Sequence, residues 1–175
     1  SAFRAADLGR EVTLVDKDPT LGGVCLNRGC IPSKTLLHIA KVLEEAESLK
    51  KMGVTFTKPT IDIDLVRDWK NKVVAQLSGG IGQMAKARKV KTIQAEATFL
   101  SDNEVQLKSE SSTEKITFDH CVVASGSSSS IIPGIPFDNE NVLTSKTALD
   151  LKKIPESLLV IGGGYIGLEL SLIHI

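Results

Sequence analysis

A glycine-rich segment that carries two cysteines and leads into a helix restricts the fold of this chain. It reads GGVCLNRGCIPSK from Gly22 to Lys34. Four residues separate Cys25 from Cys30, so a disulfide between them would close a small ring and restrain little chain entropy. Such a bond stabilises a fold only weakly. The spacing therefore favours a redox-active pair over a structural crosslink.

The residues after the second cysteine predict a helix over positions 33–52. Apolar side chains recur there every three or four residues, at Leu36, Ile39, Leu43, Ala46 and Leu49. Pro32 suits a first helical turn, and Gly53 suits the position after a helix end. Cys30 then lies at the helix N-terminus, where unpaired N–H groups and the helix dipole favour a thiolate. Lys34, one turn further on, adds positive charge on the same side.

The cysteines could instead form a structural crosslink or bind a metal. A structural disulfide is disfavoured by the small ring. A zinc site needs about four ligands, and the remaining candidates are Cys121 and three scattered histidines. Cys121 lies in an apolar run and is interpreted as a small buried hydrophobic residue.

Length and charge limit the classes of partner. The 175 residues suffice for one domain and part of another, and 42% of them are hydrophobic. With 21 basic and 21 acidic residues, the sequence predicts neither a nucleic-acid partner nor a membrane partner. A reactive dithiol suits a reducing compartment, so we expect a cytoplasmic location.

The N-terminal residues predict part of a dinucleotide-binding unit. Residues 1–8 fit the second half of a helix closed by Gly9, and residues 11–15 fit a strand that ends in Asp16. An acidic residue there is the ribose-binding position of such folds, about 20 residues after a glycine-rich turn. That turn would precede Ser1, so we expect the chain to begin inside the unit.

The middle of the chain predicts one helical stretch followed by short strands. The helix is expected over residues 63–90, interrupted at Ser78-Gly79-Gly80 and Gly82, with a solvated charged face. That face holds Arg67, Asp68, Lys70 and Lys72. Alternating runs at residues 91–94, 97–100, 104–108 and 115–118 predict a small antiparallel sheet, with a turn at 109–114.

Two apolar segments nearer the C-terminus are predicted strands. Residues 121–124 lead into the small-residue turn Ser125-Gly126-Ser127. Residues 157–161 lead into a G-x-G-x-x-G turn from Gly162 to Gly167, which in this context fits a pyrophosphate at a helix N-terminus. The residues present do not separate NAD from NADP.

The last six residues, 170–175, break the preceding pattern and match a translated sequencing adapter. We expect a non-native scar, with an ordinary apolar helix continuation as the alternative. The expected organisation is one domain over residues 1–145, the start of a second over 146–169, and the scar.

Together these residues resemble the flavoprotein disulfide reductases, and among them most closely the bacterial dihydrolipoyl dehydrogenases, over residues 1 to about 169. Leu26-Asn27 and Ile31-Pro32-Ser33-Lys34 distinguish that group from glutathione and mercuric reductases. The resemblance implies an α/β fold. It would contain a partial FAD-binding Rossmann-like domain with a small antiparallel β insertion, then the first strand and glycine turn of a second, NAD-binding Rossmann-like domain.

The resemblance also implies roles for particular residues. Cys25 would exchange with substrate, Cys30 would face the flavin, and Lys34 would approach the flavin while paired with Glu169. Asp16 would hold the FAD ribose and Ala97 the adenine end. Further FAD contacts would come from Thr20, Leu21, Gly22, Gly23, Val24 and Cys25, and from Ala124, Ser125, Gly126 and Ser127. NAD contacts would come from Gly162, Gly163, Gly164, Tyr165, Ile166 and Gly167.

The implied activity is the FAD-dependent oxidation of protein-bound dihydrolipoamide, with NAD as acceptor. The implied partners are the lipoyl domain of a dihydrolipoyl acyltransferase and, in the full-length enzyme, a second copy of the protein. The family's catalytic histidine has no counterpart here, because His38, His120 and His174 stand in other contexts. The first G-x-G-x-x-G of the family, most of its NAD domain and its central and dimerisation domains also have no counterpart in these residues, so we expect this chain to be inactive alone. A glutathione- or mercuric-reductase-type flavoenzyme and a non-catalytic thiol-bearing module remain the alternatives.

Overall fold

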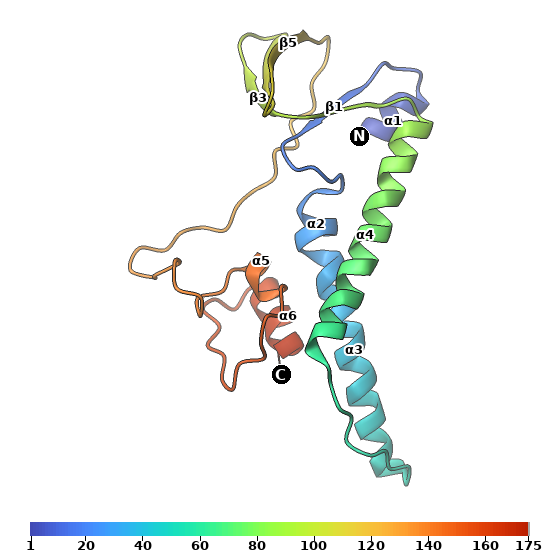
Figure 1. The fold of residues 1–175 in the computed structure, drawn as a ribbon, viewed down its shortest axis with the longest axis vertical. Helices are drawn as coiled ribbons and strands as arrows, with labels where there is room; N and C mark the ends of the chain where they lie inside the picture. Colours follow the sequence, from blue (N-terminus) through green and yellow to red (C-terminus); the bar gives the residue numbers. More distant parts are fainter. Residues whose placement is uncertain (175) are drawn as a thin grey trace. The chain divides into compact units, whose positions relative to one another are not determined.

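The computed structural model describes residues 1–174, which divide into two compact units. Unit 1 contains Ser1–Gly23 and Leu77–Gly126. Unit 2 contains Val24–Gln76 and the residues from Ser127 onward. The fold is mixed α/β, as the sequence predicts, with one parallel and one antiparallel sheet (Figure 1).

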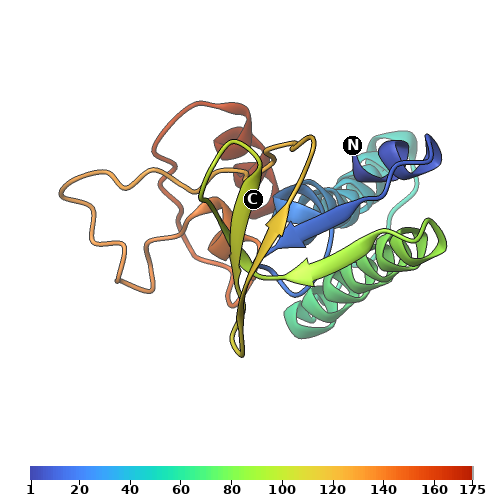
Figure 2. The ribbon, with the colours of Figure 1, turned by 90° about the horizontal axis from the view of Figure 1, so that it is seen from above.

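Unit 1 begins with part of a parallel α/β layer. Helix α1 (Ala2–Asp7) leads into a turn at Gly9, whose φ of 80° suits glycine. Strand β1 (Thr13–Asp16) then pairs in parallel with β2 (Lys91–Gln94), and Asp16 lies opposite Gln94 (Figure 2). The predicted strand that ends in Asp16 is therefore confirmed.

The antiparallel sheet of unit 1 contains β3 (Glu96–Phe99), β4 (Glu104–Lys108) and β5 (Thr113–Thr117), in that order. Its core side chains are Ala95, Val105 and Leu107, with Leu107 only 1% exposed. The predicted small antiparallel sheet is confirmed for three of its four predicted strands, which correspond to β3, β4 and β5. The prediction for residues 91–94 was wrong in one respect, because that strand pairs with β1 instead.

Unit 2 holds the helix that follows the cysteines. The short helix α2 (Gly23–Arg28) is joined by Gly29 to α3 (Cys30–Ser48), which continues as a 3-10 turn, η1 (Leu49–Met52). Gly53 ends it with a left-handed φ of 86°. The predicted helix and its end are confirmed.

Helix α4 (Ile63–Ala87) runs without a break for 25 residues, so the predicted interruption at its glycines was wrong. A glycine inside a helix costs about 1 kcal/mol relative to alanine. The good helix formers on both sides of Gly79, Gly80 and Gly82 offset that cost. The predicted solvated face was also wrong at Lys70, which is only 5% exposed.

The core of unit 2 lies between α3 and two C-terminal helices, α5 (Ser145–Ala148) and α6 (Tyr165–His174). Its buried side chains are Leu36, Leu149 and Leu151. Leu170 and Ile173 of α6 pack against them, so residues 170–174 continue a helix in this structure, and Ile175 lies outside the described residues.

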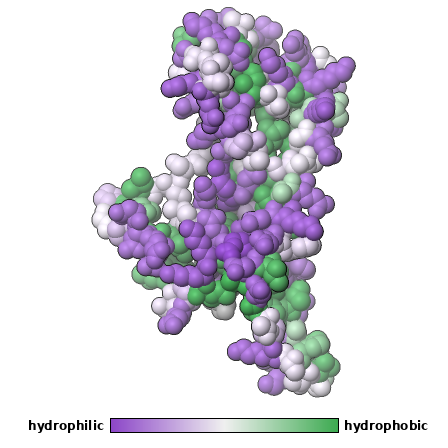
Figure 3. Space-filling model, viewed as in Figure 1, coloured by the Kyte–Doolittle hydropathy of each residue, from purple (hydrophilic) through white to green (hydrophobic). Residues whose placement is uncertain are grey.

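Two predicted strands are absent from the described residues. Residues 121–124 and 157–161 are exposed and belong to no strand within residues 1–174. A parallel strand is stabilised by hydrogen bonds to its neighbours and by burial on both faces, and neither segment has these here. Consequently Cys121 is exposed rather than buried, and apolar side chains such as Leu159 reach the surface; Figure 3 shows apolar residues at the surface.

In the described part of the chain, no helix is both long and apolar enough to cross a bilayer.

Candidate redox site

Cys25 and Cys30 form a disulfide, with their Cα atoms 4.7 Å apart. Cys25 lies in α2, and Cys30 is the first residue of α3. Gly29 links the two helices at very close range, since a Cβ there would lie 3.1 Å from the carbonyl oxygen of Val24. The single-residue link brings the two sulfurs within bonding distance, as their spacing predicts.

The first turn of α3 places one sulfur of the pair at a helix N-terminus. The backbone N–H of Ser33 donates to the carbonyl oxygen of Gly29 at 3.0 Å, which fixes Cys30 in that turn. A 19-residue helix gives this end a dipole that favours negative charge. Both cysteines are exposed. A thiol can therefore reach the bond, and a Cys30 thiolate would be stabilised after it opens.

One turn beyond the disulfide, α3 is joined to α6 by an ion pair. Lys34 Nζ donates to Glu169 Oε1 at 2.7 Å, the pairing that the resemblance implies. The Ser33 hydroxyl donates to the same oxygen. These hydrogen bonds from Lys34 and Ser33 lower the pKa of the Glu169 carboxyl below its usual value of 4.5, so the group is ionised at neutral pH.

Sequence reasoning missed the Ser33 contact. Ser33 is 5% exposed and precedes Leu36 by three residues, which places it in line with the apolar stripe of the helix. A polar residue in such a stripe is buried and requires a hydrogen-bond partner. The position of Ser33 in the apolar stripe was therefore the sequence signal that its hydroxyl has a buried hydrogen-bond partner. The sequence alone does not identify Glu169 as that partner.

Of the residues predicted along FAD before Cys25, those up to Gly22 lie in unit 1 at the end of β1 and in the turn that follows it, whereas Gly23 and Val24 begin helix α2. Asp16 ends β1, and its Oδ1 accepts a hydrogen bond of 3.0 Å from the backbone N–H of Asp18. The Leu21 carbonyl oxygen accepts one of 3.1 Å from the Ser78 hydroxyl. Gly22 has a φ of 121°, which only glycine adopts readily. The hydrogen bonds made by Ser78 of α4 and by the Asp16 carboxylate therefore fix this turn.

The remaining predicted FAD residues are exposed. Ala97 lies in β3, and residues 124–127 lie outside any helix or strand. Gly126 has a φ of 71° in that segment. Ala97 and residues 124–126 belong to unit 1, whereas Ser127, the disulfide, Lys34 and Glu169 belong to unit 2.

The glycine turn before α6 is built tightly. A Cβ on Gly167 would lie 2.7 Å from the carbonyl oxygen of Gly162 and 3.0 Å from Val160 Cγ1, so only glycine fits there. A Cβ on Gly164 would meet no described atom within 4 Å. In dinucleotide-binding turns the third glycine permits close helix packing and the second lets the backbone approach a pyrophosphate. This turn fits both requirements, and α6 begins within it at Tyr165.

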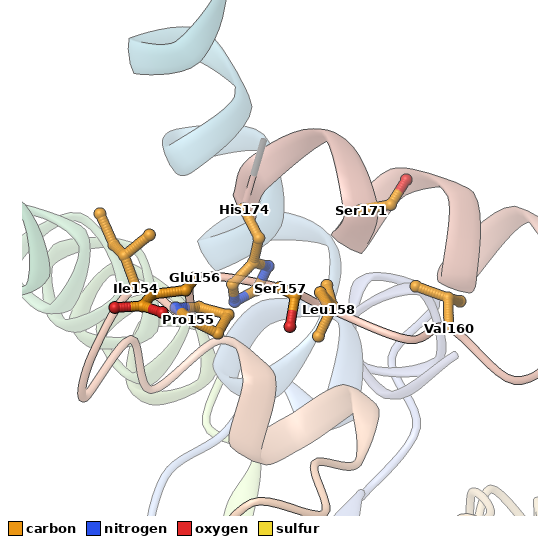
Figure 4. A pocket seen from close by; sticks show the side chains of 8 residues that line it. All are labelled: Ile154, Pro155, Glu156, Ser157, Leu158, Val160, Ser171 and His174. Atoms are coloured by element: carbon orange, nitrogen blue, oxygen red, sulfur yellow. The ribbon is translucent and has the colours of Figure 1, made fainter.

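A pocket of about 390 Å³ lies between residues 154–160 and α6, with the His174 side chain pointing into it (Figure 4). Its lining contains neither cysteine nor any residue predicted to hold a cofactor. His174 Nδ1 lies 2.8 Å from the Leu170 carbonyl oxygen of its own helix. We assign this pocket no function. Among residues 1–174, no group of three His, Cys, Asp or Glu side chains could hold a metal ion.

Curated relatives share the sequence throughout the chain. The dihydrolipoyl dehydrogenase of Vibrio cholerae is 47% identical over 174 residues, which is 99% of this chain and 37% of the relative. That of Bacillus subtilis is 45% identical over 171 residues, or 98% of this chain and 36% of the relative. The chain therefore spans little more than a third of the relatives that it matches.

Solved structures share the fold. The flavoprotein disulfide reductase RclA of Escherichia coli superposes with a TM-score of 0.79 at 26% identity, over 98% of this chain and 36% of that one. LpdA of Mycobacterium tuberculosis gives a TM-score of 0.76 at 23% identity, over 89% and 34%. Residues 1–174 match the family described as pyridine nucleotide-disulphide oxidoreductase. The paired cysteines, the glycine turn and these matches show that the chain belongs to the pyridine nucleotide-disulphide oxidoreductase family.

Proposed function

We propose that this chain supplies the redox disulfide of a dihydrolipoyl dehydrogenase, which oxidises protein-bound dihydrolipoamide with FAD as cofactor and NAD as acceptor. One observation carries the proposal: the exposed Cys25–Cys30 disulfide stands at the N-terminus of α3, one turn before the Lys34–Glu169 pair. The identity of 47% to a relative with that name supports the same substrate.

The two cysteines and the two lipoyl sulfurs account for every bond that forms or breaks in the exchange. A lipoyl thiolate attacks Cys25, forms a mixed disulfide and releases Cys30 as a thiolate, which the end of α3 stabilises. The second lipoyl sulfur, once deprotonated, attacks the first, closes the oxidised lipoyl ring and releases Cys25. Cys25 takes up one substrate proton and the other goes to a base or to solvent. Onward transfer of the electron pair to NAD is the chemistry supplied by bound FAD.

Other residues would bind the cofactors. Asp16 would accept hydrogen bonds from the FAD ribose, and the turn at residues 20–25 would follow the flavin side. Ala97 and residues 124–127 would contact FAD through backbone atoms, and Lys34 would face the flavin. The Gly162–Gly167 turn would bind the NAD pyrophosphate, a role that its open backbone and the start of α6 support.

The setting of this activity is part of the proposal. Residues 1–145 would belong to an FAD domain and residues 146–169 would begin an NAD domain, while residues 170–175 are left out of the functional assignment. The chain spans 37% of its Vibrio cholerae relative, so activity would require segments equivalent to the rest. The active form would be a homodimer in the bacterial cytoplasm, meeting the lipoyl domain of a dihydrolipoyl acyltransferase.

A chimaera tests the proposal. Residues 1–169 replace the matching segment of the Vibrio cholerae enzyme, and the purified protein should be yellow and reduce NAD with dihydrolipoamide. Partial reduction should produce a long-wavelength thiolate-to-flavin absorbance band. Cys30→Ser should abolish this band without changing the circular dichroism spectrum, whereas Cys121→Ser should leave the band intact.

The other outcomes separate the alternatives. A folded but colourless chimaera would contradict the proposal and favour a non-catalytic thiol-bearing module. A yellow chimaera that reduces another disulfide but not lipoamide would favour a related reductase. A band that survives Cys30→Ser would show that the two sulfur roles are reversed.

A further inference from the structure

We propose that Ser33 is a positioning residue, which fixes the Glu169 carboxylate and, through it, the Lys34 ammonium one helical turn from Cys30. The hydroxyl of Ser33 and the ammonium of Lys34 both donate to a single oxygen, Glu169 Oε1. The inference rests on the proposed function for its purpose, because Lys34 would face the flavin there. The contact itself can be measured without any cofactor.

The two donors to Glu169 differ in mobility. Ser33 is 5% exposed and has one side-chain torsion before its oxygen, so α3 holds its hydroxyl almost rigidly. The Lys34 side chain is 63% exposed and has a flexible four-carbon stem. Exposed ion pairs contribute little to stability, partly because ordering such a side chain costs entropy. Lys34 alone would therefore hold the carboxylate weakly.

The carboxylate needs a second partner to keep one orientation. The terminal torsion of a glutamate is broad and nearly two-fold, so a single flexible donor leaves either oxygen available. The buried Ser33 hydroxyl selects Oε1 and ties α6 to α3 at this point. With the carboxylate fixed, the Lys34 ammonium has a defined partner, and its position follows from that of Ser33.

Carbon-13 NMR of the Glu169 carboxyl in the full oxidised chain tests this contact, with the signal assigned through Glu169→Gln. Ser33→Ala should move the titration midpoint of Glu169 toward the ordinary glutamate value, because one donor to the charged form is lost. Ser33→Thr keeps the hydroxyl and should preserve the low midpoint. Thr35→Val is the matched control, since the Thr35 hydroxyl on the same helix donates to the Ile31 carbonyl oxygen instead.

A second variant keeps the test decisive if Ser33→Ala unfolds. Lys34→Met removes the charged partner from an exposed position, and the midpoint of Glu169 should stay below the ordinary value because Ser33 still donates. A midpoint that returns fully to the ordinary value would overturn the inference. So would an unchanged midpoint in Ser33→Ala, or equal shifts in Ser33→Ala and Thr35→Val.

The outcome is independent of the proposed enzyme activity. If the midpoint shifts as expected but the chimaera described above binds no flavin, the positioning role of Ser33 stands and the proposed function fails. If the chimaera is active while Ser33→Ala leaves the midpoint unchanged, the function stands and the positioning role fails.

Discussion

Lys70 on α4 donates a hydrogen bond of 2.7 Å to the backbone carbonyl oxygen of Leu149, at the end of α5. Lys70 is buried, and its burial lowers the pKa of the ammonium below the usual 10.5, although the charge of Asp150 opposes that shift. The same turn holds Leu151 at a φ of 48°, which a bulky residue adopts only at a cost. Lys70 thus anchors a strained turn in the core of unit 2.

Replacing Lys70 should destabilise the chain. Lys70→Met leaves the Leu149 carbonyl oxygen without this donor, and a buried unpaired acceptor costs about 1–3 kcal/mol. Urea unfolding followed by circular dichroism measures the loss. Lys72→Met is the control on the same helix. Lys72 is exposed and lies over the Trp69 ring at 5.8 Å, so its loss should cost less than about 1 kcal/mol.

The pH dependence of unfolding gives a further check on Lys70. Because its pKa is lower in the folded chain, the unfolded chain binds this proton more tightly, and stability should rise with pH between the folded pKa and 10.5. The stability advantage of wild type over Lys70→Met should therefore grow toward alkaline pH. A difference that shrinks there would contradict the burial of the charge.

Glu169→Gln should remove a pH-dependent part of the stability. The pKa of Glu169 is lowered on folding, so its contribution is present above about pH 4.5 and is lost as the pH falls through the folded value. Since Lys34 is largely exposed, that contribution should be about 1 kcal/mol or less. The difference between the unfolding free energies of wild type and variant, measured from pH 3 to 7, should flatten above the usual pKa.

Reducing the disulfide should leave the chain folded. The bridge joins residues five apart in sequence, and a ring of that size contributes about 2 kcal/mol at most in chain-entropy estimates. Urea unfolding with and without dithiothreitol measures the contribution, and Cys121→Ser verifies that the exposed third thiol plays no part. A loss of all cooperative unfolding on reduction would indicate a structural crosslink.

Gly167→Ala should distort the contact between the first turn of α6 and Gly162. The added methyl group would lie 2.7 Å from a backbone oxygen, and such overpacking costs about 1–3 kcal/mol. Gly163→Ala adds the same group where no described atom lies within 4 Å, so it should be tolerated. Gly164→Ala should also fold, yet it should weaken NAD binding in the chimaera because the backbone could no longer approach the pyrophosphate. Amide NMR spectra and NAD titrations distinguish the three variants.

Local signals in the sequence predicted most of the elements. Alternating runs gave the bounds of β2 and β4, and the apolar stripe with Gly53 gave α3 and its end. The close spacing of Cys25 and Cys30 in a glycine-flanked segment predicted a pair able to form a disulfide, and the two are bonded in the structure. These features depend on residues that are close together in the sequence, so they can be predicted from one sequence alone.

Features that depend on distant partners were not predictable in the same way. The burial of Lys70 depends on α5, 79 residues away, and the contact of Ser33 depends on α6, 136 residues away. The apolar runs at 121–124 and 157–161 have the composition of strands, but strand formation requires neighbouring strands, and none of the described residues supplies them. Pattern alone could not supply that information.

The exposure of Cys121 has a practical consequence. The chain has three cysteines and two of them are bridged, so under non-reducing conditions a maleimide dye would attach at Cys121 alone. The label would sit in unit 1, whereas the bridged sulfurs lie in unit 2. A fluorophore at that thiol can therefore report on the surroundings of residue 121 while the bridged pair stays chemically untouched.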